Sequence, residues 1–137
     1  MRRIACIILC GLVSLTISAQ HHHGRGPQDG RGPHHHIECA TGEQLNMAMQ
    51  VLENQSFDDK RLEVAELCVV LGRFCTEDLA RMARVFSFDD NRTKFLTFAY
   101  RYCQDPQNYY RLREVFEFES NFRTMMDAVM PGYDRRP

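Results

Sequence analysis

The chain contains a tandem repeat with a period of about 30 residues. The sequence SFDD at residues 56–59 recurs at residues 87–90, 31 residues later, and a weaker copy, EFES at residues 117–120, follows after another 30 residues. A repeat of this length corresponds to a pair of secondary-structure elements, which cannot bury its apolar face alone. Neighbouring copies must therefore stack on one another, and we expect one continuous core across the repeats.

The residues around each copy show the period of an α-helix. Apolar residues recur at positions i, i+3, i+4 and i+7, and no stretch shows sustained alternation of apolar and polar residues. A predicted core stripe of Val64, Leu67, Cys68 and Leu71 matches Phe95, Phe98, Ala99 and Tyr102 in the next copy. We expect an all-α fold of tandem helical hairpins, with about six short helices near residues 43–54, 58–73, 77–86, 90–103, 106–116 and 120–130.

We expect the repeated SFDD sequence to cap helix starts. Ser and Asp side chains accept hydrogen bonds from the free N–H groups of a helix start, and a negative charge suits the positive end of the helix dipole. With Asp58 as the N-cap, Phe57 would pack against Leu62 as a hydrophobic staple. A calcium site is the alternative, but neither copy provides the ligand pattern of an EF-hand loop with its central glycine and terminal glutamate.

Several motifs taken together resemble those of one known family. They are QSFDDK at residues 55–60, FSFD at 86–89, Ala99-Tyr100, Asp105 with Asn108-Tyr109, and FEFES at 116–120. On these residues, the stretch from 47 to 129 resembles the domain of unknown function 4476 family, which is found largely in secreted proteins of Bacteroidota. The resemblance implies a compact, exported helical domain. It implies no catalytic residue, because the family has no assigned activity.

The N-terminus has the pattern of an export signal. Arg2 and Arg3 precede the apolar run IACIILCGLVSLTIS, and Ala19 is a small residue at a suitable cleavage position. An uncleaved anchor is the alternative, but the run is shorter than the ~20 residues that span a bilayer comfortably. We therefore expect residues 1–19 to be removed as a signal peptide. The rest of the chain would then be periplasmic or extracellular and would have no membrane span.

All six histidines of the chain lie in the next segment, residues 20–36. This segment contains the unit GRGP twice and no large apolar residue, so we expect a disordered arm. Its histidines are His21, His22, His23, His34, His35 and His36. Clustered imidazoles bind Cu(II), Ni(II) or Zn(II), so the arm is a candidate metal site. The alternative is a solvated spacer that binds metal only adventitiously.

The chain that follows the arm is acidic. The whole sequence has 17 basic and 18 acidic residues, but from residue 37 onward there are 13 basic and 17 acidic residues, a net charge of −4. This balance argues against a nucleic-acid partner. We expect residues 37–130 to form the helical-repeat domain. Residues 131–137 would form a mobile tail, because Pro131 and Gly132 end the last helix.

The helical domain lacks the usual components of a catalytic site. It contains no histidine to activate a nucleophile, and Gly42, Gly72 and Gly132 are isolated rather than grouped in a phosphate-binding loop. We expect a domain that is not an enzyme and requires no cofactor. A catalytic pair of carboxylates is the alternative that the many Asp and Glu residues leave open.

Four cysteines remain after removal of the signal peptide: Cys39, Cys68, Cys75 and Cys103. Disulfides form in the oxidising environment that an exported protein meets. Cys75 and Cys103 lie at matching helix ends of the repeat, so stacked hairpins would bring them together, and this is the leading pair. Cys68 lies on an apolar stripe, and we expect a buried free thiol. Cys39 would either pin the arm or pair between two chains.

Tyrosines are the candidates for a partner-binding surface. Tyr100 and one of Tyr109 and Tyr110 fall outside the apolar stripe, and exposed tyrosines favour protein or glycan contacts. We expect an exported, non-enzymatic domain that binds a protein or an envelope component. The alternative is capture of Cu, Ni or Zn by the arm, with the helical domain as its carrier.

Overall fold

The computed structural model describes residues 37–133, whose regular structure is entirely helical. The elements are α1 (Gly42–Glu53), α2 (Asp58–Leu71), α3 (Thr76–Ala83), α4 (Asp89–Ala99), the 3-10 helices η1 (Tyr100–Tyr102) and η2 (Pro106–Val115), and α5 (Glu119–Val129). No strand occurs in these residues, so the predicted all-α class is confirmed. None of the described helices is long and apolar enough to cross a bilayer. The predicted signal peptide and arm lie outside the described residues.

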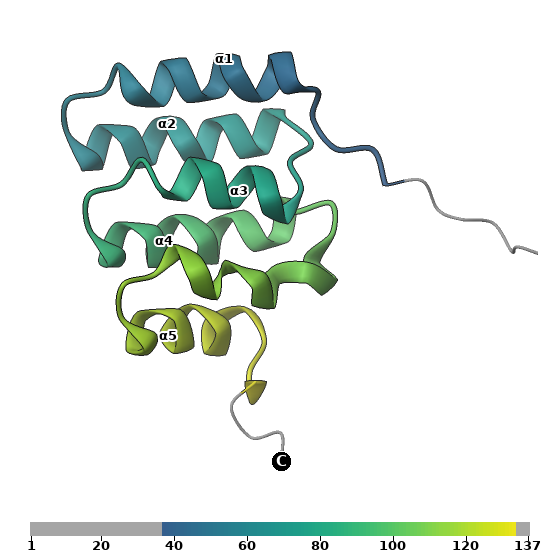
Figure 1. The fold of residues 1–137 in the computed structure, drawn as a ribbon, viewed down its shortest axis with the longest axis vertical. Coiled ribbons are helices and arrows are strands. Elements are labelled where there is room, and N and C mark those ends of the chain that lie inside the picture. The colour runs from purple at the N-terminus through teal and green to yellow at the C-terminus, as the bar shows by residue number, and fades with distance from the viewer. Residues whose placement is uncertain (1–36, 134–137) are drawn as a thin grey trace, which may run out of the picture. The chain divides into compact units, whose positions relative to one another are not determined.

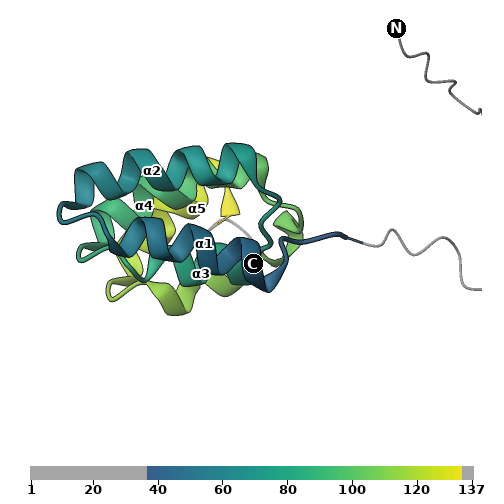
Figure 2. The same ribbon diagram turned by 90° about the horizontal axis from the view of Figure 1, so that it is seen from above.

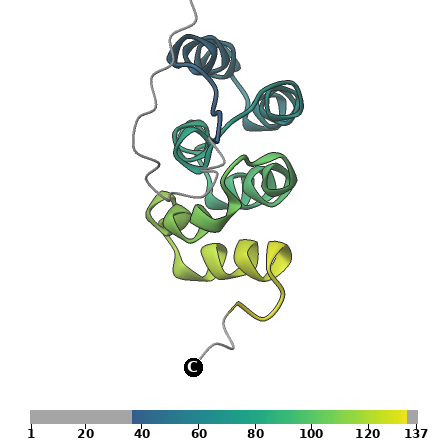
Figure 3. The same ribbon diagram turned by 90° about the vertical axis from the view of Figure 1, so that its right-hand side faces the viewer.

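The helices form a stack of antiparallel hairpins (Figure 1). Helix α2 packs against α1 and α4, α4 packs against α5, and α3 packs against η2. Figures 2 and 3 show two layers, with α1, α3 and η2 on one side and α2 and α4 on the other, while α5 lies at the end of the stack. The turns that lead into α2, α4 and α5 therefore lie at one edge, on the left of Figure 1.

The core runs between the layers and takes side chains from every α-helix and from η2. Its largest fully buried side chains are Tyr109, Phe86, Phe95, Leu52, Leu79, Met82, Leu96, Leu112, Met125, Met126 and Val69. The Tyr109 hydroxyl donates a 2.7 Å hydrogen bond to the carbonyl oxygen of Leu96, which satisfies this polar atom inside the core. Burial raises the pKa of Tyr109 well above its ordinary value, so the hydroxyl stays a donor.

The helix starts at the SFDD copies are not capped as predicted. The N-cap residues of α2 and α4 are Phe57 and Phe88, and neither helix has a side-chain cap. Asp58 is instead the first residue inside α2. Phe57 is exposed, so the predicted staple against Leu62 is also wrong. Its carboxylate does not cap its own helix start and instead accepts hydrogen bonds from Ser87 and Asn91 of the next hairpin.

The repeated aspartates link each hairpin to the next one. Asp58 accepts a 3.0 Å hydrogen bond from the backbone N–H of Ser87, which lies just before α4. Asp89 accepts bonds of 3.0 and 2.9 Å from the backbone N–H groups of Glu117 and Phe118, just before α5. A carboxylate of α2 therefore holds the turn that leads into α4, and a carboxylate of α4 holds the turn that leads into α5.

Each of these aspartates also pairs with an arginine three residues later. Arg61 pairs with Asp58, and Arg92 pairs with Asp89 at 2.8 Å; all four side chains are largely buried. Both guanidinium groups also donate to carbonyl oxygens of the turn before their own helix, and Arg92 donates to the last residue of η2. Buried charges are tolerated when they are paired and hydrogen-bonded in this way.

The predicted α-helix at residues 106–116 is a 3-10 helix, η2. Its buried residues are Tyr109, Leu112 and Val115, each three residues from the next. A 3-10 helix has 3.0 residues per turn, so this spacing places all three side chains in line on the core side. In an α-helix with 3.6 residues per turn the same side chains would drift around the axis. The packing against α3 therefore favours the tighter helix.

The first residues of the predicted mobile tail are packed on α5. Residues 131–133 continue into a turn, in which Gly132 has a φ of 87°, a conformation that favours glycine. The ring of Tyr133 meets Phe122 edge-on at a centroid distance of 6.1 Å. An aromatic contact therefore joins residue 133 to α5. Residues 134–137 lie outside the described part of the chain.

Candidate functional site

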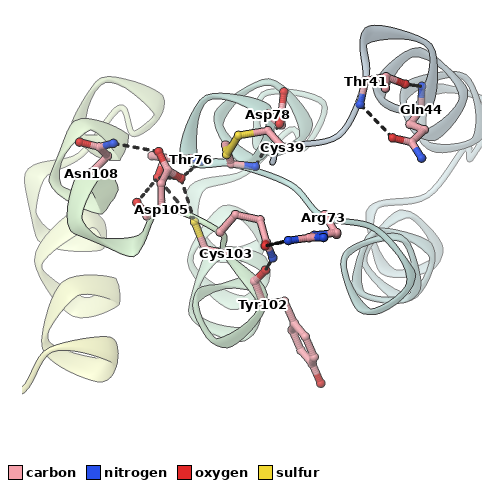
Figure 4. The surroundings of a disulfide bond; sticks show 12 residues. Cys39, Thr41, Gln44, Arg73, Thr76, Asp78, Tyr102, Cys103, Asp105 and Asn108 are labelled. Atoms are coloured by element: carbon pink, nitrogen blue, oxygen red, sulfur yellow. Dashed lines mark hydrogen bonds between the residues drawn. A yellow bond between two sulfur atoms is a disulfide. The ribbon is translucent and has the colours of Figure 1, made fainter. Parts of the chain in front are cut away.

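The segment before α1 is joined to the start of α3 by a disulfide between Cys39 and Cys75 (Figure 4). The Cα atoms of the two cysteines are 5.4 Å apart. Beside the disulfide, the N–H of Ala40 donates a 2.6 Å hydrogen bond to the carbonyl oxygen of Arg73. The Arg73 guanidinium in turn lies 3.4 Å from the carboxylate of Glu38. These contacts anchor the base of the N-terminal segment to the helical domain.

The predicted pairing of Cys75 with Cys103 is wrong. The repeat does bring their two segments together, since the N–H of Gln104 donates a 3.0 Å hydrogen bond to the carbonyl oxygen of Phe74. However, the segment before α1 runs back along the α2–α3 connection and brings Cys39 to Cys75, which leaves Cys103 as a free thiol. Of the two roles considered for Cys39, pinning the N-terminal segment is the one observed.

The free thiols of Cys68 and Cys103 are held in the protonated form. Cys103 Sγ donates to the carboxylate of Asp105 at 3.3 Å and lies 3.6 Å from the hydroxyl of Thr76. Burial raises the pKa of Cys103 to about 11, and burial also raises the pKa of Cys68. Because the thiolate is the reactive species, this environment does not activate either cysteine. Cys68 is free, as predicted, but only partly buried.

Asp105 joins the start of α3 to the start of η2. Its carboxylate accepts hydrogen bonds from the Thr76 N–H at 2.6 Å, from the Thr76 hydroxyl at 2.9 Å and from the Asn108 amide at 2.8 Å (Figure 4). Burial acts to raise the pKa of Asp105, but these hydrogen bonds outweigh it and hold the pKa below its ordinary value. Asp105 and Asn108 therefore have a structural role that sequence spacing did not indicate.

The three candidate tyrosines do not form one surface. Tyr109 is fully buried, so its predicted role in partner binding is wrong. Tyr100 is half-buried, and its ring meets Tyr109 edge-on at a centroid distance of 5.0 Å. Tyr110 is exposed on η2. The three-residue turn of η2 explains the difference, because it places Tyr109 in line with the core residues and its neighbour outside.

A group of exposed apolar side chains lies on the first hairpin. This group, the apolar face, consists of Met47 and Val51 on α1 and Leu67, Val70 and Leu71 on α2. Leu71 is 77% exposed. Three of these residues, Met47, Val51 and Leu71, line a groove of about 370 Å³ between α1 and α2, together with Cys68 and Phe74. The sequence pattern did not indicate this surface, because it assigned Leu67 and Leu71 to the core.

The prediction that Leu67 and Leu71 face the core is wrong. The buried residues of α2 are Ala65 and Val69. Helix α2 is the first helix of its layer, and its packing partners among the described helices are α1 and α4. The equivalent stripe of α4 is better covered, because α4 packs between α2 and α5. The apolar stripe is therefore better buried on α4, inside the stack, than on α2, near its N-terminal end.

Carboxylates border the apolar face. Glu43 lies one helical turn before Met47 on α1, and Glu66 lies one turn before Val70 on α2. Neither glutamate has an ion pair within the described residues. Helix α1 contains no Lys or Arg, and both basic residues of α2 are paired with carboxylates of the same helix. The surroundings of the face are therefore negatively charged.

The predicted metal site does not involve the helical domain. Within residues 37–133, no group of three or more His, Cys, Asp or Glu side chains is placed to hold a metal ion. The candidate ligands His21 to His23 and His34 to His36 lie outside the described residues, so metal binding by the arm stays a prediction.

These observations define the class of the protein: an all-helical domain of stacked hairpins with an apolar groove at its N-terminal end. The chain belongs to the family Domain of unknown function (DUF4476), whose family model matches residues 40–130. The match includes every helix from α1 to α5, and the resemblance noted in the sequence is confirmed. No match was found among curated proteins or among solved structures.

Proposed function

We propose that this protein is an exported, non-enzymatic binding domain that recognises a protein partner through the apolar face of its first hairpin. The observation that carries the proposal is the exposed groove lined by Met47, Val51 and Leu71. Contiguous exposed apolar surface is typical of interaction sites in globular proteins. Burial of a Val, Leu or Met side chain contributes about 1.5–3 kcal/mol, so a partner that covered this face would gain substantial binding free energy.

The shape and charge of the groove favour a helical partner. The groove lies between the antiparallel helices α1 and α2. Further along the stack, each helix packs against other helices of the domain. An amphipathic helix can bind such a groove through apolar residues on one of its sides. Since Glu43 and Glu66 border the face without basic counterparts in the described residues, the partner helix should carry Lys or Arg beside its apolar stripe.

Two further features support the export and binding parts of the proposal. The Cys39–Cys75 disulfide suits an oxidising compartment outside the cytoplasm. The free thiols of Cys68 and Cys103 have raised pKa values, which disfavours a role as nucleophiles. A binding role needs neither an activated nucleophile nor a bound cofactor.

Affinity capture from the native envelope fraction tests the proposal. The full chain is compared with the double variant Leu67→Lys and Leu71→Lys, and with Tyr110→Lys, which alters an exposed residue of η2 outside the apolar face. We expect a partner that is retained by the original chain and by the Tyr110 variant. The double variant should bind this partner about a hundredfold more weakly or worse, because it lacks two leucines that the partner would bury. Equal retention by the double variant would contradict the proposal.

Metal capture by the arm is the second candidate function. It is supported by the placement of all six histidines in residues 21–36. Calorimetry with Cu(II) on the full chain, and on a variant with all six histidines replaced by serine, tests it directly. We expect the variant to lose the high-affinity phase, because imidazole nitrogens are the strong ligands of the segment. Equal affinity of the two proteins would remove the arm as a metal site.

A further inference from the structure

Three phenylalanines stand at the same position of successive repeats and are exposed. Phe57, Phe88 and Phe118 are the residues immediately before α2, α4 and α5, and they are 74%, 69% and 63% exposed. The starts of these three helices lie along one edge of the stack (Figure 1). We call these three residues the phenylalanine row. Because all three side chains are exposed to solvent, they contribute little to the core.

The backbone of the row is the same in each copy. The φ and ψ angles are −121° and 137° at Phe57, −125° and 142° at Phe88, and −108° and 128° at Phe118. The turns before α4 and α5 are also held by the hydrogen bonds that their backbone N–H groups donate to Asp58 and Asp89. The backbone positions that carry the rings are therefore set before any ligand binds, which lowers the entropic cost of binding.

Exposed carboxylates lie within two residues of each phenylalanine in the sequence. Asp59 and Asp90 each follow a phenylalanine by two residues, are exposed, and form no ion pair within residues 37–133. The third ring, Phe118, lies between Glu117 and Glu119 in the sequence, and these glutamates already pair with arginines, so the unpaired negative charge lies near the first two rings. A cation near such a ring gains a cation–π interaction with the ring face and a Coulomb attraction to the carboxylate. The row is therefore suited to a cationic ligand.

The repeat spacing matches one extended conformation. Helix α4 packs against both α2 and α5, and packed helices are separated by about 8–10 Å. A polyproline II segment advances by 3.1 Å per residue with three residues per turn, so every third residue recurs after about 9 Å. Side chains three residues apart in such a segment would thus meet successive rings of the row.

We propose that the phenylalanine row binds an extended, cationic segment of another protein, in the polyproline II conformation, with Lys or Arg at every third position. This inference goes beyond the proposed function, because the row lies at the edge formed by helix starts and not on the apolar face. A second copy of this chain is disfavoured as the ligand, since it would bring the same carboxylates against one another. An uncharged ligand would make no use of those carboxylates.

A titration of the full chain with a synthetic peptide of four Arg-Pro-Pro units tests the proposal. Replacement of Phe88 by Ala should weaken binding by roughly two- to fivefold, and replacement of all three phenylalanines by roughly tenfold or more, as the loss of cation–π contacts predicts. The variant Asp59→Asn with Asp90→Asn should bind more weakly and with a smaller salt dependence. The exposed aromatic residue Tyr110 provides the matched control, and Tyr110→Ala should bind like the original chain.

Two comparison peptides complete the experiment. A peptide of four Glu-Pro-Pro units should not bind, and a helical peptide with the same number of arginines should bind more weakly than the extended one. The proposal is overturned if the Arg-Pro-Pro peptide does not bind, if the triple variant binds it as well as the original chain, or if Tyr110→Ala has the same effect as Phe88→Ala. Leu67→Lys with Leu71→Lys should leave this binding unchanged, so the two proposed surfaces fail or succeed separately.

Discussion

The two ends of the helical stack meet solvent in different ways. At the C-terminal end, α5 buries large apolar residues such as Phe122 and Met126 and exposes polar ones such as Arg123 and Asp127. Stacked repeats need a polar outer surface on the terminal unit to remain soluble, and α5 has one. This end has the character of a closed terminus.

The N-terminal end has the opposite distribution. Helix α2 buries the smaller residues Ala65 and Val69, while Leu67 and Leu71 are exposed. Part of the apolar surface that would stabilise this hairpin is left on the outside, and a disulfide holds the hairpin to α3 instead. The same amphipathic pattern therefore supplies the core within the stack and an exposed apolar surface at its N-terminal end.

The largest expected effect concerns the disulfide at the N-terminal end. Replacement of Cys39 by Ser removes a cross-link between residues 36 apart, which should lower the free energy of unfolding by about 4 kcal/mol on the chain-entropy account. Urea unfolding measures the loss, and hydrogen exchange should show α1 and α2 opening before α4 and α5. Cys68→Ser is the control and should leave stability nearly unchanged. Equal loss of protection at both ends would show that the disulfide does not stabilise the N-terminal end in particular.

The second largest loss of stability should come from breaking the link between α4 and the turn before α5. Asp89→Asn leaves Arg92 without its anionic partner, and hydrogen bonds to charged groups contribute about 1.5–3 kcal/mol, so unfolding should become easier by that amount. Asp58→Asn is the matched variant at the first hairpin. A loss of stability in Asp58→Asn but not in Asp89→Asn would show that Asp89 does not hold α5 to the stack.

The same aspartate should make stability depend on pH. Burial acts to raise the pKa of Asp89, but hydrogen bonds from the Phe118 N–H and from Arg92 outweigh it and hold the pKa below its ordinary value of 3.8. A group with a lowered folded-state pKa adds stability that is complete above its unfolded-state value and is lost as the pH falls toward the folded-state value. Acid unfolding of Asp89→Asn should therefore show a weaker pH dependence below about pH 4.

A smaller effect is expected from the buried phenol. Tyr109→Phe keeps the ring but removes the hydrogen bond to Leu96, which leaves a buried carbonyl oxygen with one partner fewer. The free energy of unfolding should fall by about 1 kcal/mol, as measured by thermal or urea unfolding. Tyr110→Phe, on the exposed neighbour, should change nothing measurable. Equal effects of the two substitutions would argue against the 3-10 register of η2.

The smallest effect should come from the apolar face. Leu71 is largely exposed, so Leu71→Ser should change the free energy of unfolding by less than about 0.5 kcal/mol. A loss above about 1 kcal/mol would show that Leu71 belongs to the core and that the N-terminal end is closed as well. This measurement checks the structural basis of the proposed binding surface without knowledge of the partner.

Much of the fold could be predicted because it depends on local patterns. The apolar period of 3.6 residues predicted each α-helix, and the α1 and α2 starts fall within one residue of the expected positions. The candidate sites were less predictable because they depend on contacts between distant residues. Cys39 lies 36 residues from Cys75, and Thr76 lies 29 residues from Asp105, so no local pattern indicated either contact.

The sequence by itself determined the helical class and the family. Those properties follow from side-chain periodicity and from motifs, which are present before the chain folds. Only the tertiary structure decided which cysteines pair, that Tyr109 is buried while Tyr110 is exposed, and that the SFDD aspartates hold the next hairpin. It also decided that an apolar stripe at the N-terminal end stays in water. The physical reason is that burial depends on what packs against a helix, and an amphipathic sequence specifies its apolar side but not the neighbour that covers it.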